Sequence, residues 1–169
     1  EPFVITGDLT VTGDLAVTGT ITSATNYITL ATPQTTTSGT TKDFTGIPAG
    51  TRRITLSFSG VSTNSTSAFL VQIGDAGGIE ATGYLSGSAN SAGQANSTIG
   101  FILNTVSAAA GLYAGTVILT LMDSSTNAWS EIHGVARTDS AEGFSGGGMK
   151  PLSAELTQVR FTSVTPDTF

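Results

Sequence analysis

The segment Arg53-Ile54-Thr55-Leu56-Ser57-Phe58-Ser59 decides the fold class of this chain. Its apolar residues Ile54, Leu56 and Phe58 alternate strictly with hydroxyl residues. A period of two places these two sets on opposite faces of an extended strand. One apolar face and one polar face are typical of a strand in an antiparallel sheet that covers a core on one side. The segment therefore predicts a half-buried antiparallel β-strand.

Similar runs, rich in β-branched and aromatic residues, continue to the end of the chain and are separated by Gly, Ser, Asn and Thr clusters. We expect strands over 27–31, 42–45, 53–61, 68–73, 83–85, 98–104, 115–122, 128–137 and 152–164. We expect long polar loops over 62–67, 86–97 and 141–150, and one helical turn at most over 107–111. About nine short strands without helices predict an all-β fold, an antiparallel β-sandwich of jelly-roll or Greek-key type.

Composition limits the classes of function. The 169 residues suit one domain with an appendage, and only 11% of them are charged, against about 25% in typical soluble domains. The net charge is -6 and the six Lys and Arg residues are scattered, so nucleic-acid binding is not expected. Cysteine is absent, which excludes disulfides and thiolate sites. No apolar run approaches the roughly 18 residues of a membrane helix, so we expect no membrane insertion.

Upstream of these strands, residues 7–24 repeat a six-residue unit and read GDLTVT, GDLAVT and GTITSA. Apolar residues fall on odd positions and Thr, Asp or Ala on the even positions between 6 and 22, which gives one apolar stripe and one polar stripe. The apolar stripe consists of Phe3, Ile5, Leu9, Val11, Leu15, Val17 and Ile21.

One extended strand cannot bury this stripe alone, because ribbons of one or two strands are marginal in water. A single-chain hexapeptide β-helix needs about three units per coil and several coils, and this segment supplies one coil. Three chains around a common axis would bury the stripe, and Gly at every sixth position lets the backbones approach closely. We therefore predict a homotrimeric stem over residues 1–25 and a β-sandwich head over 26–169; the alternative is an edge hairpin packed on the head.

Residues that carry chemistry do not form a recognisable site in the sequence. His133 is the only histidine and alternates with Trp129, Glu131, Val135 and Arg137 on one strand face; a solvated or structurally hydrogen-bonded role is favoured. Around Asp75, the sequence Asp-Ala-Gly-Gly favours a tight turn over a calcium loop. Residues 146–148 are three glycines followed by Met, Lys and Pro, which argues against a phosphate loop. We expect no catalytic residue, metal site or cofactor.

Three aromatic residues are candidate ligand contacts, because exposed rings near loop ends can stack on sugars or anchor a partner. They are Tyr84, Tyr113 and Trp129. A buried position is the alternative for all three, and it is favoured for Trp129 as the single Trp of a sandwich.

Two stretches resemble components of bacteriophage particles. The run Gly7-Asp8-Leu9-Thr10-Val11-Thr12-Gly13-Asp14-Leu15-Ala16-Val17-Thr18-Gly19-Thr20-Ile21 resembles stems of phage tail fibres and related virion appendages. The run Ala31-Thr32-Pro33-Gln34-Thr35-Thr36-Thr37-Ser38-Gly39-Thr40, continuing through Asp43-Phe44-Thr45-Gly46-Ile47-Pro48-Ala49-Gly50-Thr51-Arg52-Arg53-Ile54-Thr55, resembles a module that recurs in phage structural proteins. The resemblance implies a trimeric fibre or spike module at the virion surface, with adhesion to the host cell as its usual role.

Three functions follow as hypotheses. The first is a receptor-binding fibre or spike that contacts a host glycan or protein and is joined to other virion proteins. The second is a capsid decoration or head-fibre protein at threefold positions of the shell. The third, a glycan-cleaving spike, needs paired acidic groups in a groove, and the few acidic residues here lie mostly in predicted turns. Copy number per particle would separate the first two.

Overall fold

The computed structural model describes Thr12 and residues 28–169. The predicted stem, with its apolar residues Phe3, Ile5, Leu9, Val11, Leu15, Val17 and Ile21, lies outside the described residues. The chain divides into two units, Glu1–Thr32 and Pro33–Phe169, and all described strands belong to the second. No helix occurs among the described residues, so none of them forms a helix able to cross a membrane.

Eleven β-strands make up the described part of the chain. They are β1 (Lys42–Thr45), β2 (Arg53–Val61), β3 (Phe69–Asp75), β4 (Gly78–Ile79), β5 (Leu85–Asn90), β6 (Gly93–Ser97), β7 (Phe101–Ile102), β8 (Tyr113–Asp123), β9 (Ala128–Arg137), β10 (Glu142–Pro151) and β11 (Gln158–Ser163). Every pairing between them is antiparallel. The fold-class prediction, an antiparallel all-β sandwich, is thus confirmed.

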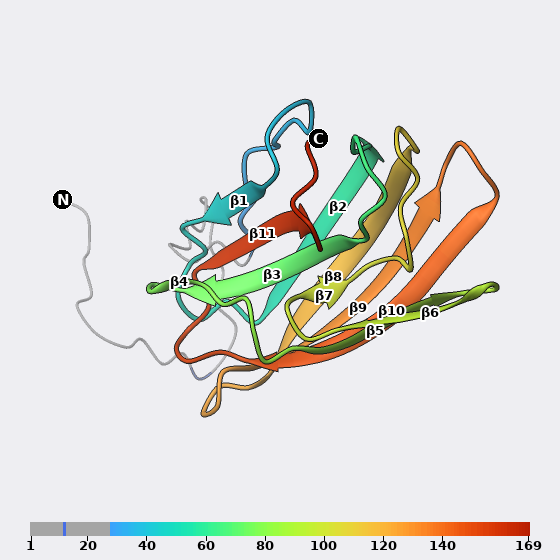
Figure 1. Cartoon of the computed structure of the whole chain (residues 1–169). Helices are drawn as coiled ribbons and strands as arrows, with labels where there is room; N and C mark the ends of the chain where they lie inside the picture. Colours follow the sequence, from blue (N-terminus) through green and yellow to red (C-terminus); the bar gives the residue numbers. More distant parts are fainter. Residues whose placement is uncertain (1–11, 13–27) are drawn as a thin grey trace. The chain divides into compact units, whose positions relative to one another are not determined.

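The strands form two sheets that lie in separate layers (Figure 1). The five-stranded sheet has the order β1-β11-β3-β4, with β7 also paired to β3. The six-stranded sheet has the order β2-β8-β9-β10-β5-β6. Arg160 of β11 forms a bidentate ion pair with Asp43 of the edge strand β1, and both N···O distances are 2.7 Å.

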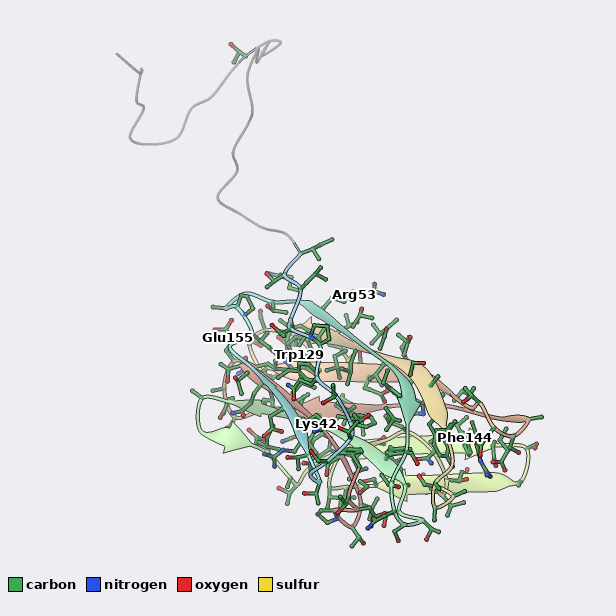
Figure 2. The ribbon with its side chains drawn as sticks, turned by 90° about the horizontal axis from the view of Figure 1, so that it is seen from above. Lys42, Arg53, Trp129, Phe144 and Glu155 are labelled. Carbon is green, nitrogen blue, oxygen red and sulfur yellow. The ribbon has the colours of Figure 1, made fainter. Side chains whose placement is uncertain are left out.

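One hydrophobic core fills the space between the sheets, and aromatic rings connect the two layers. Phe69 of β3 packs edge to face on Tyr113 of β8, with 5.1 Å between the ring centroids. The ring centroids of Phe161 on β11 and Phe58 on β2 are 5.0 Å apart. Figure 2 labels Trp129 and Phe144, which the six-stranded sheet contributes to the same core. Because both sheets bury aromatic side chains in it, this core holds the two layers together.

Strand prediction from the sequence gives the observed bounds for three strands and misses two strand regions that are rich in Gly and Ser. Strands β1, β2 and β9 have the predicted bounds, whereas 28–31 contains no strand and the predicted strand 152–164 shrinks to β11. Two predicted loops are wrong: 86–97 lies mostly in the hairpin β5–β6, and 141–150 lies almost wholly in β10. Low strand propensity of Gly and Ser hid these strands, which form because neighbouring strands satisfy their backbone groups.

Candidate functional site

The six-stranded sheet has an inner face toward the core and an outer face, and β9 shows how the sequence divides between them. Trp129, Glu131, His133 and Val135 are buried on the inner face. The residues between them, 130, 132, 134 and 136, belong to the outer face. The sequence analysis placed the first four residues on one face, and the structure confirms this.

A hydrogen-bonded chain of three polar side chains lies on the inner face. Nδ1 of His133 is 2.9 Å from Oε1 of Glu131, and its Nε2 is 3.0 Å from Oγ of Ser88 on β5. This order of hydroxyl, imidazole and carboxylate is the one that activates a serine nucleophile in hydrolases. The sequence analysis favoured a solvated or structurally hydrogen-bonded His133, and the structure shows the hydrogen-bonded form, with two side-chain partners.

The missing side chain of Gly146 makes this chain of contacts possible. Strand β10 separates β9 from β5, and Gly146 is the residue of β10 that pairs with both His133 and Ser88. A Cβ at Gly146 would overlap the carbonyl oxygen of Gly87 and come within 2.7 Å of Cε1 of His133. His133 therefore reaches across β10 to Ser88 only because position 146 is glycine.

The same packing encloses the hydroxyl group. Ser88 is 2% exposed and His133 is 6% exposed, and the second carboxylate oxygen of Glu131 is buried without a hydrogen-bond partner. A nucleophile must have space beside it for the reacting atom of the substrate. The cluster of Ser88, Glu131 and His133, hereafter the inner polar cluster, has the hydrogen bonds of a triad in a closed environment.

A second polar group lies where β3, β10 and the segment after β10 meet. Nζ of Lys150 contacts Oε2 of Glu80, and the hydroxyl of Ser153 donates to Asp75 at 2.6 Å and to Glu80 at 2.8 Å. The Ser153 hydroxyl and the Gly77 amide lower the pKa of Asp75. Burial acts to raise the pKa of Glu80, but hydrogen bonds from Lys150 and Ser153 outweigh it, and the pKa is lowered.

The turn predicted at Asp75 is present: Asp75 pairs with Gly78, and Oδ1 of Asp75 accepts a hydrogen bond from the Gly77 amide at 2.7 Å. Among the described residues, no three His, Asp or Glu side chains are grouped as a metal site requires. The three glycines 146–148 lie within β10, not in a loop.

All three candidate ligand contacts, Tyr84, Tyr113 and Trp129, are buried in the core, so their rings are not presented to a ligand. The sequence analysis favoured burial for Trp129 and left both tyrosines open. The hydroxyl of Tyr84 accepts from the Ile73 amide and donates to the Glu80 carbonyl, and burial raises its pKa. The hydroxyl of Tyr113 accepts from the Ala108 amide. Trp129 is one of the residues that line a hollow of about 270 Å³, together with Arg52, Asn127 and Glu155.

The outer face of the six-stranded sheet is the side that points away from the core. It comprises four rows of paired residues, and each row contains one of the β9 residues Ser130, Ile132, Gly134 and Ala136. The other members are Arg53, Thr55, Ser57, Ala114, Thr116, Ile118, Thr120, Gly143, Ser145, Gly147, Met149, Leu85, Gly87, Ala89, Gln94 and Asn96. Arg53, on the edge strand β2, is the one charged residue of this set.

Large apolar side chains are exposed near the middle of the outer face. Ile132 is 60% exposed, Leu85 is 68% exposed and Met149 is 40% exposed. Leu85 pairs directly with Met149, and Ile132 lies diagonally from Met149 through its pairing with Gly147. A hollow of about 480 Å³, lined by Leu85, Gly87 and Asn96 among others, adjoins them. Sequence reasoning missed this surface, because it placed Leu85 and Met149 at loop ends.

No protein-family model, no curated protein and no solved structure matches this chain in the comparisons made.

Proposed function

We propose that this chain is a non-enzymatic structural component of a bacteriophage particle, a homotrimer in which residues 1–25 form the stem and residues 26–169 form the head. The observation that carries the proposal is the hexapeptide repeat of residues 7–24, with apolar residues at odd positions and Gly at every sixth. An apolar stripe on so narrow a ribbon needs identical neighbours to exclude water.

The head is suited to adhesion without a deep binding site. Away from the outer face, the head has a hollow of about 270 Å³, lined by Arg52, Asn127 and Glu155 among others. Weak contacts to a host glycan or surface protein, repeated on three copies, gain overall strength through avidity. We favour a fibre or spike at the surface of the particle, joined there to other virion proteins.

Burial of Ser88 supports the non-enzymatic part of the proposal. A serine hydrolase labels with fluorophosphonate probes because its nucleophile is open to solvent. We expect no labelling of the intact chain, since Ser88 and His133 are enclosed. Labelling that is lost on Ser88→Ala substitution would overturn this part of the proposal.

Sedimentation of the intact chain tests the trimer. We expect a species of about three times the 17.0 kDa chain mass at micromolar concentration. A variant that carries Ser in place of Leu9, Val11, Leu15 and Val17 should sediment as a folded monomer. A well-folded monomer of the unaltered chain would contradict the proposal.

A capsid decoration at threefold positions would use the same trimer. Immunogold labelling of intact particles with an antibody to the head separates the two locations. A few copies at the tail support the fibre, and tens to hundreds of copies over the shell show the decoration instead.

A further inference from the structure

We infer that the outer face of the six-stranded sheet is the surface through which the head domains of three copies of this chain contact one another. The inference rests on the proposed homotrimer and names the part of the head that completes it. Its occupant is a second and a third copy of the same chain.

The distribution of charge selects this face. Each copy carries a net charge of -6, so copies that meet through charged surfaces repel one another. No acidic residue lies among the members of the outer face, and its one charge, Arg53, is at the margin. The described acidic residues lie outside these four rows: Glu131 is on the inner face, Asp43 is in the other sheet, and Asp123, the last residue of β8, pairs with Ala128 one row beyond Ser130. Two copies can therefore join here without burying an unpaired charge.

The arrangement of side chains is that of an interface. Ile132, Leu85 and Met149, together with the half-buried Ile118, occupy the four central strands β8, β9, β10 and β5. The edge strands β2 and β6 contribute Thr, Ser, Asn and Gln to the same rows. Across the strands, the apolar residues are thus central and the polar residues marginal, which is the usual organisation of protein interfaces.

The dimensions of the face suit threefold packing. Six strands at about 4.8 Å spacing span about 24 Å, and four rows about 6.8 Å apart along the strands span about 20 Å, which gives roughly 490 Å² per copy. Standard interfaces bury about 800 Å² per partner, so this contact adds to a trimer that the stem holds together. Three flat faces 24 Å wide that close a triangle lie about 7 Å from its axis, which is within reach of Ile, Leu and Met side chains.

The small residues of the face fit the same arrangement. Faces in a triangle converge toward its corners, where only short side chains have room. Gly134 has no atom within 4 Å of the position that a Cβ would take, so its neighbourhood is open to a side chain of another copy. Small residues on the sheet also allow close approach of backbones.

Cross-linking of the intact chain tests the inference, because the chain has no cysteine and each introduced thiol is unique. In the triangular arrangement, Cα atoms of residue 132 on neighbouring copies are about 12 Å apart, which a short bismaleimide spans. We expect Ile132→Cys to cross-link at least tenfold faster than Val106→Cys. Val106 is a matched control, since it is 57% exposed and lies between β7 and β8, outside the outer face.

A second variant, Ile132→Glu, tests the contact without a reagent. It places a like charge on each copy at an exposed position, so circular dichroism should show an unchanged fold. The frictional ratio of the trimer should rise because the heads separate, and Val106→Glu should leave it unchanged.

The outcomes distinguish the inference from the proposed function. Fast cross-linking at residue 132 in a trimer supports both. A trimer in which residues 132 and 106 cross-link equally slowly overturns the inference, because another partner or solvent then covers the face, and leaves the stem-based trimer intact. A folded monomer that cross-links at neither position overturns the proposed function, and the inference with it.

Discussion

On strand β9, the side chains that point into the sandwich include Glu131 and His133, whereas those that point away from it are Ser130, Ile132, Gly134 and Ala136. The inner face of the six-stranded sheet thus buries the side chains of Glu131, His133 and Lys150 and the hydroxyl groups of Ser86 and Ser88. The outer face exposes an isoleucine, a leucine and a methionine, and its one charge, Arg53, is at the margin. Both faces depart from the usual distribution of side chains in an antiparallel sheet.

The difference teaches that burial follows what a strand packs against more than the polarity of its residues. On the inner face, hydrogen bonds among Ser88, Glu131 and His133 offset the cost of removing polar groups from water. On the outer face, no described residue covers the apolar side chains. The inner face is covered within one chain, and the outer face leaves apolar side chains exposed.

The largest expected effect comes from breaking the inner polar cluster on one side. His133→Leu leaves the carboxyl group of Glu131 buried without its hydrogen-bond partner. Removing one member of a buried pair costs about 3–5 kcal/mol. Urea denaturation at pH 7 should show a loss of this size in the free energy of unfolding.

The double variant Glu131→Met with His133→Leu serves as the control for this prediction. It removes both polar groups and should be less destabilised than the two single changes added together, as coupled residues are. Additive losses would show that Glu131 and His133 are not energetically coupled, and their hydrogen bond would then not explain why the inner face tolerates them.

A single methyl group should produce the next largest effect. Gly146→Ala places a Cβ against the carbonyl oxygen of Gly87, 2.7 Å from Cε1 of His133 and 2.8 Å from Cα of Ser88. Because backbone atoms must move to relieve these contacts, we expect a loss of about 3 kcal/mol in thermal or urea unfolding. Gly134→Ala on the outer face has open space and should change stability by less than about 0.5 kcal/mol. Equal effects at both positions would remove the steric distinction between the faces.

Most of the fold was predictable from alternation, and the positions of Ile54, Leu56 and Phe58 gave β2 with its observed bounds. The inner polar cluster was not predictable, because it joins Ser88 to His133 across β10, and both β5 and β10 look like loops in the sequence. Their glycines and serines have low strand propensity. In β10, the signal was the spacing of two residues from Phe144 through Gly146 and Gly148 to Lys150. Phe144 and Lys150 are buried, and the two glycines between them lie on the same face of the strand.

The aromatic residues show the opposite limit of sequence reasoning. Tyr84 and Tyr113 lie near the ends of strands, as expected, but their hydroxyl groups satisfy backbone amides in the core and do not face solvent. A position close to a loop does not tell which way a ring points, because successive residues of a strand point to opposite faces of the sheet.

Protonation of Asp75 and Glu80 at acidic pH should reduce their contribution to the free energy of unfolding. Ser153→Ala removes the hydroxyl that donates to Asp75 and Glu80 at the end of the inner face, and should cost about 1 kcal/mol at pH 7. Both acids have a pKa below their ordinary values of 3.8 and 4.5, so they stabilise the fold above those values. This contribution is lost as the pH falls through the lowered pKa values.

The difference in unfolding free energy between the unaltered chain and Ser153→Ala should consequently shrink as urea titrations move from pH 7 toward pH 3. Ser130→Ala on the outer face is the control, and its small effect should be the same at both pH values. A Ser153→Ala difference that stays constant down to pH 3 would show that its hydrogen bonds do not favour the ionised acids.

The smallest expected effect concerns Ile132, and it tests whether the apolar residues of the outer face contribute to association. Ile132→Thr removes apolar surface that is 60% exposed in a single chain, so the free energy of unfolding at low protein concentration should change by less than about 0.5 kcal/mol. Val135→Thr, three residues further along β9 and buried, introduces a hydroxyl into the core and should cost about 1–3 kcal/mol. At higher concentration, association adds stability in proportion to its strength, and Ile132→Thr should then reduce the unfolding midpoint relative to the unaltered chain. An Ile132→Thr effect that is independent of concentration would mean that the apolar centre of the outer face contributes nothing to assembly.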